Sequence, residues 1–362
     1  EYRYHSLKFS DKTSIVNNPN GGVSSVFVNS EYDVNPIEIS GYIQDKVEVG
    51  NLIINAGVRF DYFDSKFKVF TDPTDPNVVF EEQRPDNNDL VFEDSEPTWQ
   101  FSPRLGIAFP ISETGALHFS YGHFFQIPNF SLLYQNPFFR LGSGSGLIGL
   151  LGNANLKPQK TINGELGYKQ ELSSSSAVEV TAFFRDIRNL AGTATDPTVV
   201  DGTSVRYGIV KNSDFGFIKG VVLTFDQGFS NGLFFTADYT FQIAKGNASD
   251  PSQAYNAAAA KTELEKRIVS LDWDQLHTVN LTSNYTSRSG WGFGAIFTAG
   301  SGFPYTPDYT LRTGTTPPSV NPLNSQRRPP KYNLDLNITK NIQMGENQRL
   351  QVYAKIDNVL DT

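Results

Sequence analysis

The sequence has no cysteine, a single methionine and no long apolar run. Without cysteine, disulfides, thiolate metal sites and cysteine nucleophiles are all excluded. The mean hydropathy is −0.34, and no stretch approaches the roughly 20 apolar residues that a membrane-spanning helix needs. A helical membrane protein is therefore excluded. A membrane β-barrel is not excluded, because a barrel strand presents only every second residue to lipid.

Positive charge is also in short supply. The 30 Lys and Arg residues are outnumbered by 38 Asp and Glu residues, which gives a net charge of −8. A protein that binds a phosphate backbone usually carries the opposite balance. We therefore expect no nucleic-acid partner.

The sequence does contain period-2 alternation of apolar and polar residues, from residue 36 to the end. In 233–243, "LFFTADYTFQI", every second residue from Leu233 is apolar, and most residues between are polar. Such alternation is typical of strands with two different faces. It predicts twelve strands, at about 37–48, 52–62, 100–110, 116–125, 162–172, 177–187, 219–229, 233–243, 278–286, 291–299, 333–339 and 350–357.

Tight turns and long connections alternate between these strands. The tight turns lie at 48–51, 112–115, 173–176, 230–232, 287–290 and 344–347, and the long connections at 63–97, 126–160, 188–218, 244–277 and 300–331. Structureless loops of about twenty residues are uncommon in compact soluble domains. The pattern favours an up-and-down transmembrane barrel with short periplasmic turns and long extracellular loops.

Two soluble folds are the alternatives. A β-propeller would show a blade repeat of about 40–50 residues, and none is found. A β-sandwich would not separate long from short connections so strictly. The fold class that we predict is therefore all-β, a transmembrane antiparallel up-and-down β-barrel.

The two faces of the predicted strands differ in chemistry. In 162–172 the alternation directs Ile162, Leu166 and Tyr168 to lipid, and Asn163, Glu165 and Lys169 to the lumen. Charges recur on the second face of other strands: Arg59, Asp61, Glu179, Arg185, Asp238, Lys355 and Asp357. Burying so many charges in a dry core would be very costly. A hydrated lumen accepts them.

Several strings point to one family. They are "GNANLKPQKTINGELGYKQEL" (152–172), "VEVTAFFRDIRNL" (178–190), "FSPRLGIAFPISETGALHFSYGHFFQIPNF" (101–130), "LDWDQLHTVNLTSNY" (271–285), "GSGFPYTP" (300–307), and the closing "RRPPKYNLDLNITKNI" and "LQVYAKIDNVLDT". In order and spacing they resemble the barrel of TonB-dependent outer-membrane receptors, from about residue 36 onward.

The resemblance implies a 22-stranded barrel filled by an N-terminal plug. It also implies a place in the Gram-negative outer membrane, among outer-membrane lipid and lipopolysaccharide. TonB would act through the plug to drive uptake of a scarce nutrient. Ferric siderophores, cobalamin, oligosaccharides and peptides are the nutrient classes that such importers share.

This sequence shows about twelve strands, no plug and no TonB box, so we expect the C-terminal part of such a barrel. Residues 1–35 are predicted to be a strand remnant and an extracellular loop, and 36–362 the barrel. A passive porin or a surface-adhesion barrel is the alternative function, since either would share the strands.

Aromatic residues in the predicted loops are the candidate ligand contacts. They could stack on sugars or catechol-like rings, or pack loop against loop. The set is Tyr134, Phe138, Phe139, Tyr255, Trp273, Tyr305 and Tyr309. No cofactor site is predicted.

Two loops raise other hypotheses. Residues 72–97 carry nine acidic residues and one Arg. Their oxygen ligands would suit calcium, but the spacing fits no calcium-loop motif, and a solvated surface loop is the plainer interpretation. Residues 249–270 predict a loop helix, with Asp250 as its cap and Pro251 in its first turn.

Enzymes are the remaining class of function. Asp272, Asp274 and His277 could form a carboxylate–histidine arrangement, but no serine motif such as G-x-S-x-G is present. We expect no enzyme activity.

Overall fold

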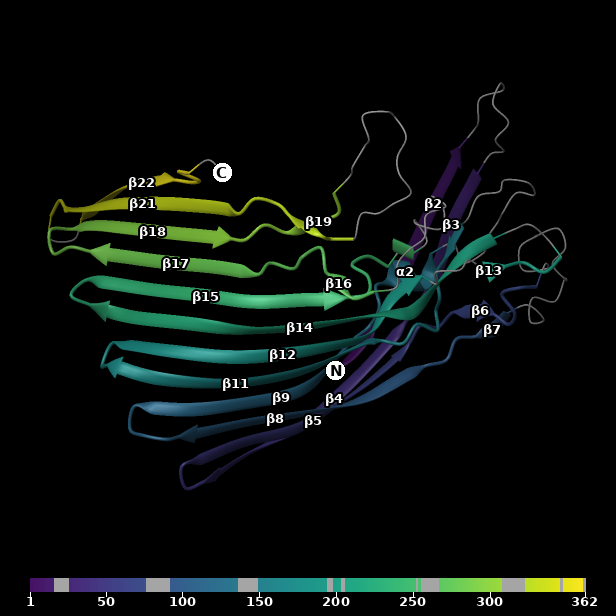
Figure 1. Cartoon of the computed structure of the whole chain (residues 1–362), viewed down its shortest axis with the longest axis horizontal. Helices are drawn as coiled ribbons and strands as arrows, with labels where there is room; N and C mark the ends of the chain where they lie inside the picture. The colour runs from purple at the N-terminus through teal and green to yellow at the C-terminus, as the bar shows by residue number, and fades with distance from the viewer. Residues whose placement is uncertain are drawn as a thin grey trace.

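The computed structural model describes residues 1–15, 26–75, 92–135, 149–193, 198–202, 206–251, 253–254, 267–307, 323–345 and 348–360. They form one large, mainly antiparallel sheet that curves into an open trough, with three small two-stranded sheets near one end (Figure 1).

Twelve long strands follow one another across the large sheet, each paired antiparallel with the next. They are β4 (Ile37–Val49), β5 (Leu52–Asp64), β8 (Thr98–Pro110), β9 (Gly115–Gln126), β11 (Gln159–Ser173), β12 (Ser176–Thr193), β14 (Arg206–Ser230), β15 (Leu233–Gly246), β17 (His277–Thr286), β18 (Trp291–Gly300), β21 (Lys331–Gln343) and β22 (Arg349–Ile356). All twelve predicted strands are confirmed.

Short strands complete the sheets. β1 (Tyr2–Tyr4) pairs with β4, β10 (Gly149–Leu151) and β13 (Thr198–Val199) pair with β14, and β16 (Val269–Ser270) pairs with β15. The small sheets are β2 (Leu7–Ile15) with β3 (Val26–Val34), β6 (Lys68–Phe70) with β7 (Phe92–Asp94), and β19 (Pro304–Tyr305) with β20 (Gln326–Arg327). The predicted division at residue 35 stays a prediction.

The short turns and the strand ends that lead into the long connections lie at opposite ends of the trough. The turns that join β4 to β5, β11 to β12 and β14 to β15 lie at the left in Figure 1, and the other ends of these strands lie toward the right, with the small sheets. This separation agrees with the pattern in the sequence.

β12 and β14 extend further at the long-connection end than the alternation predicts. Irregularities in their pairing fall at Leu190, beside Asn189, which has a positive φ of 59°. A bulge adds an unpaired residue and breaks the period of two. The strands therefore continue where their sequence no longer alternates.

The pairing register gives the sheet one polar and one apolar face. One polar row crosses six strands through Gln44, Gly57, Arg104, Gly122, Asn163 and Arg185. One apolar row contains Phe119, Leu166, Ala182, Val221 and Phe241. Since directly paired residues point to the same side, the apolar faces of successive strands join into one surface.

A packed core lies where the long connections meet the sheet. Val34, Phe63, Leu133, Tyr134 and Leu156 are all buried in it. Two of these residues belong to a five-residue helix, α2 (Phe130–Tyr134), capped by the Asn129 side chain. The sequence pattern did not predict this helix, because five residues are too few to show a 3.6-residue period.

No helix among the described residues is long and apolar enough to cross a membrane. Most of the helix predicted at 249–270 lies outside those residues, at 252 and 255–266. Its predicted end is wrong, because Val269–Ser270 form strand β16 and pair with β15.

Candidate functional site: an arginine pocket on the polar face

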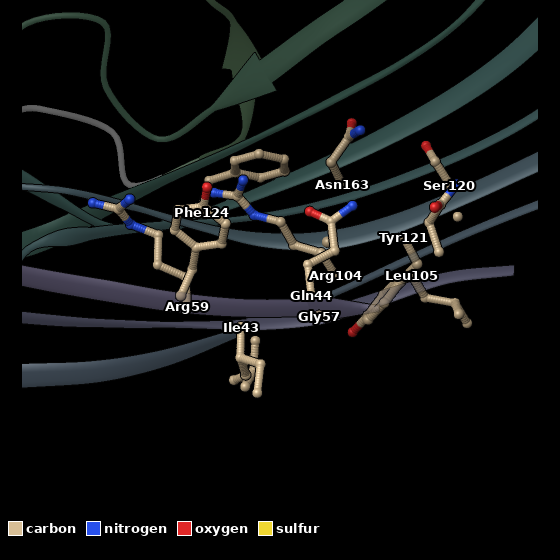
Figure 2. Close-up of a pocket in the computed structure, with 15 residues that line it drawn as sticks. Ile43, Gln44, Gly57, Arg59, Arg104, Leu105, Ser120, Tyr121, Phe124 and Asn163 are labelled. Carbon is tan, nitrogen blue, oxygen red and sulfur yellow. The ribbon is translucent and has the colours of Figure 1, made fainter. Parts of the chain in front are cut away.

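A pocket of about 490 Å³ opens on the polar face between β4 and β11. Figure 2 shows Arg59, Arg104 and Asn163 on one side of the sheet, and Ile43 and Leu105 on the other. The two sets point to opposite sides because successive side chains of a strand alternate between the faces of a sheet. The volume is within the range of small-molecule sites.

Arg104 on β8 is central to the pocket. Its row neighbours, Gly57 on β5 and Gly122 on β9, have no side chains that could crowd it. A Cβ at Gly122 would come 3.3 Å from the Phe124 ring and 3.5 Å from the Arg104 stem. Glycine thus lets the ring and the guanidinium meet, with Arg104 Cζ 4.8 Å from the centre of the Phe124 ring. The aromatic face attracts the cation and orients it.

Carboxylates pair with two other cations of this face: Arg59, which also lines the pocket, and Arg185, which lies further along the polar row. The Nε of Arg59 donates to Asp61 Oδ1 at 2.8 Å. Arg185 lies 3.9 Å from Glu165, and Asn163 bridges the two by accepting from Arg185 Nε and donating to Glu165 Oε1.

Arg104, in contrast, has no carboxylate partner within the part of the chain that the structure describes. A guanidinium presents a planar fork of donors that fits a carboxylate or a phosphate. The pocket can therefore bind an anion from the polar side of the sheet.

Tyr134, a predicted ligand contact, is fully buried. Its hydroxyl donates to the Ser65 carbonyl at 2.7 Å, and its ring lies 5.3 Å from that of Tyr32 and 5.4 Å from that of Phe67. Burial raises the pKa of the Tyr134 hydroxyl, which keeps it protonated as a donor. This position fits the loop-packing interpretation.

Trp273 and Tyr305 remain accessible, with 44% and 38% of their surfaces exposed. Both lie beside the ion pair of Asp274 and Arg327. Trp273 precedes Asp274 in the chain, and Tyr305 pairs with Gln326, the neighbour of Arg327. The structure thus brings two predicted loop contacts to one region. Their role as contacts stays a prediction.

The other predicted contacts, Phe138, Phe139, Tyr255 and Tyr309, lie outside the described residues, as does most of the acidic loop at 72–97. In the described ranges, no group of three or more His, Asp or Glu side chains is placed to hold a metal ion.

Asp274 and His277 have separate partners. Asp274 binds Arg327 and accepts from the Ala244 amide at 2.7 Å. The Nδ1 of His277 lies 2.8 Å from the Tyr239 hydroxyl, on the apolar face. Among the described residues no carboxylate is bonded to the imidazole, so the predicted carboxylate–histidine arrangement does not form there.

The alternation put Arg59 on the polar face but did not single out Arg104. In the sequence Arg104 is an ordinary polar position, "SPRLG", and nothing marks its neighbours across the sheet. Only the register shows that two glycines flank it.

The up-and-down sheet has a polar and an apolar face, and the strand ends that lead into the long connections lie at one end of it. These features define an outer-membrane type of barrel wall. Residues 1–359 match the family described as TonB dependent receptor-like, beta-barrel. The chain belongs to this family, whose members are transporters and not enzymes. Its sheet corresponds to about half of such a barrel.

Solved structures agree on the fold. The outer membrane transporter YddB from Escherichia coli matches with a TM-score of 0.67 at 13% identity, over 100% of this chain and 46% of that protein. The ferric enterobactin receptor from Pseudomonas aeruginosa matches with a TM-score of 0.57 at 16% identity, over 99% of this chain and 53% of that protein. The ferric-catecholate import receptor Fiu from Escherichia coli matches with a TM-score of 0.54 at 18% identity, over 93% of this chain and 42% of that protein.

The chain therefore spans about half the length of these proteins. Among curated proteins, no sequence matches the chain.

Proposed function

We propose that this chain is the barrel part of an active importer in the Gram-negative outer membrane, which takes up a scarce nutrient and is energised through TonB. The observation that carries the proposal is the family match over residues 1–359. The division of the sheet into an apolar and a polar face supports it, because an importer needs a hydrated interior in a lipid-facing wall.

In this proposal the long connections are extracellular and the short turns periplasmic. The packed core around Tyr134 supports the placement, since it gives the loops a rigid base on which to hold a ligand. Trp273 and Tyr305, exposed beside that end of the sheet, are the proposed ligand contacts that the structure describes.

The cargo is one of four nutrient classes: a ferric siderophore, cobalamin, an oligosaccharide or a peptide. The structural relatives carry names that refer to ferric enterobactin and ferric catecholates. At 16% and 18% identity these relatives support the fold and not a shared cargo. The arginine pocket favours an anionic partner, which is either a cargo with an anionic group or an acidic side chain of a plug inside the barrel.

The proposal is tested by uptake in cells that express the natural full-length protein. Labelled compounds from the four classes are offered to otherwise isogenic cells with and without TonB, and with and without a protonophore. We expect one compound to accumulate in the intact cells only, because import needs both TonB and the proton gradient.

Uptake that continues without TonB and without the gradient would replace the proposal with a passive porin. Uptake of none of the compounds, together with adhesion of the cells to a surface, would favour the adhesion barrel.

A further inference from the structure

Four cations gather on the apolar face, at the end of the sheet where the long connections begin. Lys160 on β11 and Arg188 on β12 are directly paired. Lys219 on β14 pairs with Ile243 on β15, and Lys245 is two residues further along that strand. Lys219 and Lys245 are therefore diagonal neighbours, which on one face lie about 7–8 Å apart. The Lys160–Arg188 pair lies one row further toward the long connections than Lys245. We call Lys160, Arg188, Lys219 and Lys245 the basic rim.

The register shows that the rim shares the face proposed to meet lipid. Lys245 pairs with Phe217, Phe217 with Asp186, and Asp186 with Ile162, which the sequence assigns to lipid. The rim is therefore on the outside of the wall, on the side of the sheet opposite to the arginine pocket.

The rim carries excess positive charge. Arg188 binds Asp186, with its Nε 2.9 Å from Oδ2, and 57% of the Arg188 side chain is still exposed. Lys160, Lys219 and Lys245 form no ion pair within the described part of the chain, and Lys219 and Lys245 are exposed. On this face of β11, β12, β14 and β15, as far as the structure describes it, four cations thus face one carboxylate, that of Asp186.

Directly below the rim the same strands are apolar. The next rows toward the short turns contain Leu166, Ala182, Val221 and Phe241, then Tyr168, Val180, Leu223 and Tyr239. A charge is costly on a lipid-facing strand except near the interface. The rim is therefore at the level where hydrocarbon gives way to lipid headgroups.

The short-turn end of this face lacks such a cluster on these strands. There β11 carries Gln170, β12 carries Ser176 and β14 carries Gln227. Lys340 on β21 is a cation at that end, but its ammonium donates to the Ser289 carbonyl at 2.8 Å and lies 4.8 Å from the Trp291 ring centre. On β11, β12, β14 and β15, the positive charge of this face is thus on one side of the apolar band.

We propose that the basic rim binds the phosphate groups of an anionic lipid in the leaflet next to the long connections. Lysines at a membrane surface are attracted to anionic headgroups, and their flexible stems let the ammonium reach a phosphate while the methylenes lie on the apolar wall. The inference rests on the lipid-facing wall of the proposed function, but not on its cargo or its coupling to TonB.

The test measures lipid binding to the natural full-length protein in a neutral detergent. The probes are bisphosphorylated lipid A and the same lipid without its phosphates, and native mass spectrometry counts the bound molecules. We expect the double variant Lys219→Gln/Lys245→Gln to bind the phosphorylated lipid roughly tenfold or more weakly, because each lysine contributes separately to the attraction. Binding of the dephosphorylated lipid should not change.

Two controls keep the result interpretable. Lys340→Gln removes an occupied cation from the other end of the same face and should leave binding unchanged. Lys219→Arg/Lys245→Arg keeps the charge and should keep most of the binding, which separates charge loss from misfolding.

Equal affinity of the wild type and the double glutamine variant would overturn the proposal, and so would an equal loss in Lys340→Gln. Complete competition by millimolar inorganic phosphate would assign the rim to a free anion and not to a lipid. Because nutrient uptake is measured separately, failure of the importer proposal would not be confused with failure of this one.

Discussion

Arg104 illustrates what a single residue acquires from its neighbours across a sheet. Its two immediate neighbours in the row, Gly57 and Gly122, have no side chains, and the Phe124 ring supports its guanidinium from the next row. Arg59 and Arg185, at similar positions on the same face, are each tied to a carboxylate. The difference makes Arg104 the cation of this wall best placed to bind an incoming anion.

The two-face assignment predicts opposite outcomes for neighbouring residues of β14. Leu223 pairs with Val180 and Tyr239 on the apolar face, whereas Val222 pairs with Thr181 and Thr240 on the polar face. We expect Leu223→Arg to destabilise the protein by about 2–4 kcal/mol, because it places a charge near the middle of the apolar band. Val222→Arg should be almost neutral. Chemical unfolding from lipid vesicles measures both, and equal losses would contradict the assignment.

At the scale of elements, Asp274 and Arg327 fasten two long connections to the sheet. Asp274 is fully buried between β16 and β17, where it accepts from the Ala244 amide. Arg327 on β20 binds the Asp274 side chain and donates to the carbonyls of Asp274 and Gly302. One ion pair thus joins β15 to the connection that contains Asp274, before β17, and to the connection that contains Arg327, before β21. Trp273 and Tyr305 lie beside it.

Removal of Asp274 should release this region. Asp274→Ala leaves the Arg327 cation without its partner and the Ala244 amide without its acceptor, which should cost about 3 kcal/mol of local stability. Hydrogen exchange in peptides that cover 241–246 and 323–330 should then be faster by about two orders of magnitude. Asp272→Ala is the matched control, since Asp272 receives its bond from Asn324 at an exposed site. Equal acceleration in both variants would disprove the role of the ion pair.

At the scale of the whole molecule, the trough has two open edges. All eight residues of β22 are exposed. At the other edge, β1 pairs with β4 only from Tyr2 to Tyr4. In a membrane, backbone groups along such edges have to be paired, and closure of the barrel is how strands achieve this.

Residues 1–362 expressed alone should therefore not form a closed monomeric barrel. We expect self-association in detergent, measured by light scattering, and no heat-dependent shift in gel mobility. The natural full-length polypeptide is the control and should show the shift. A monomeric, heat-shifting form of the 362-residue chain would contradict the expectation.

The sequence by itself determined the strands, the order of turns and long connections, and the chemistry of each face. Period-2 alternation is a local property, so 233–243 reveals its two faces without knowledge of any partner strand. The bulge at Leu190 and helix α2 were missed, because one breaks the period and the other is too short to establish one.

Only the tertiary structure decided which residues meet. The pocket joins residues from β4 to β11, and the basic rim joins residues from β11 to β15, across long connections of variable length. The register between strands places Arg104 between two glycines, and packing of distant loops buries Tyr134. These are non-local contacts, which depend on how strands align and loops fold together and leave no local pattern in the chain.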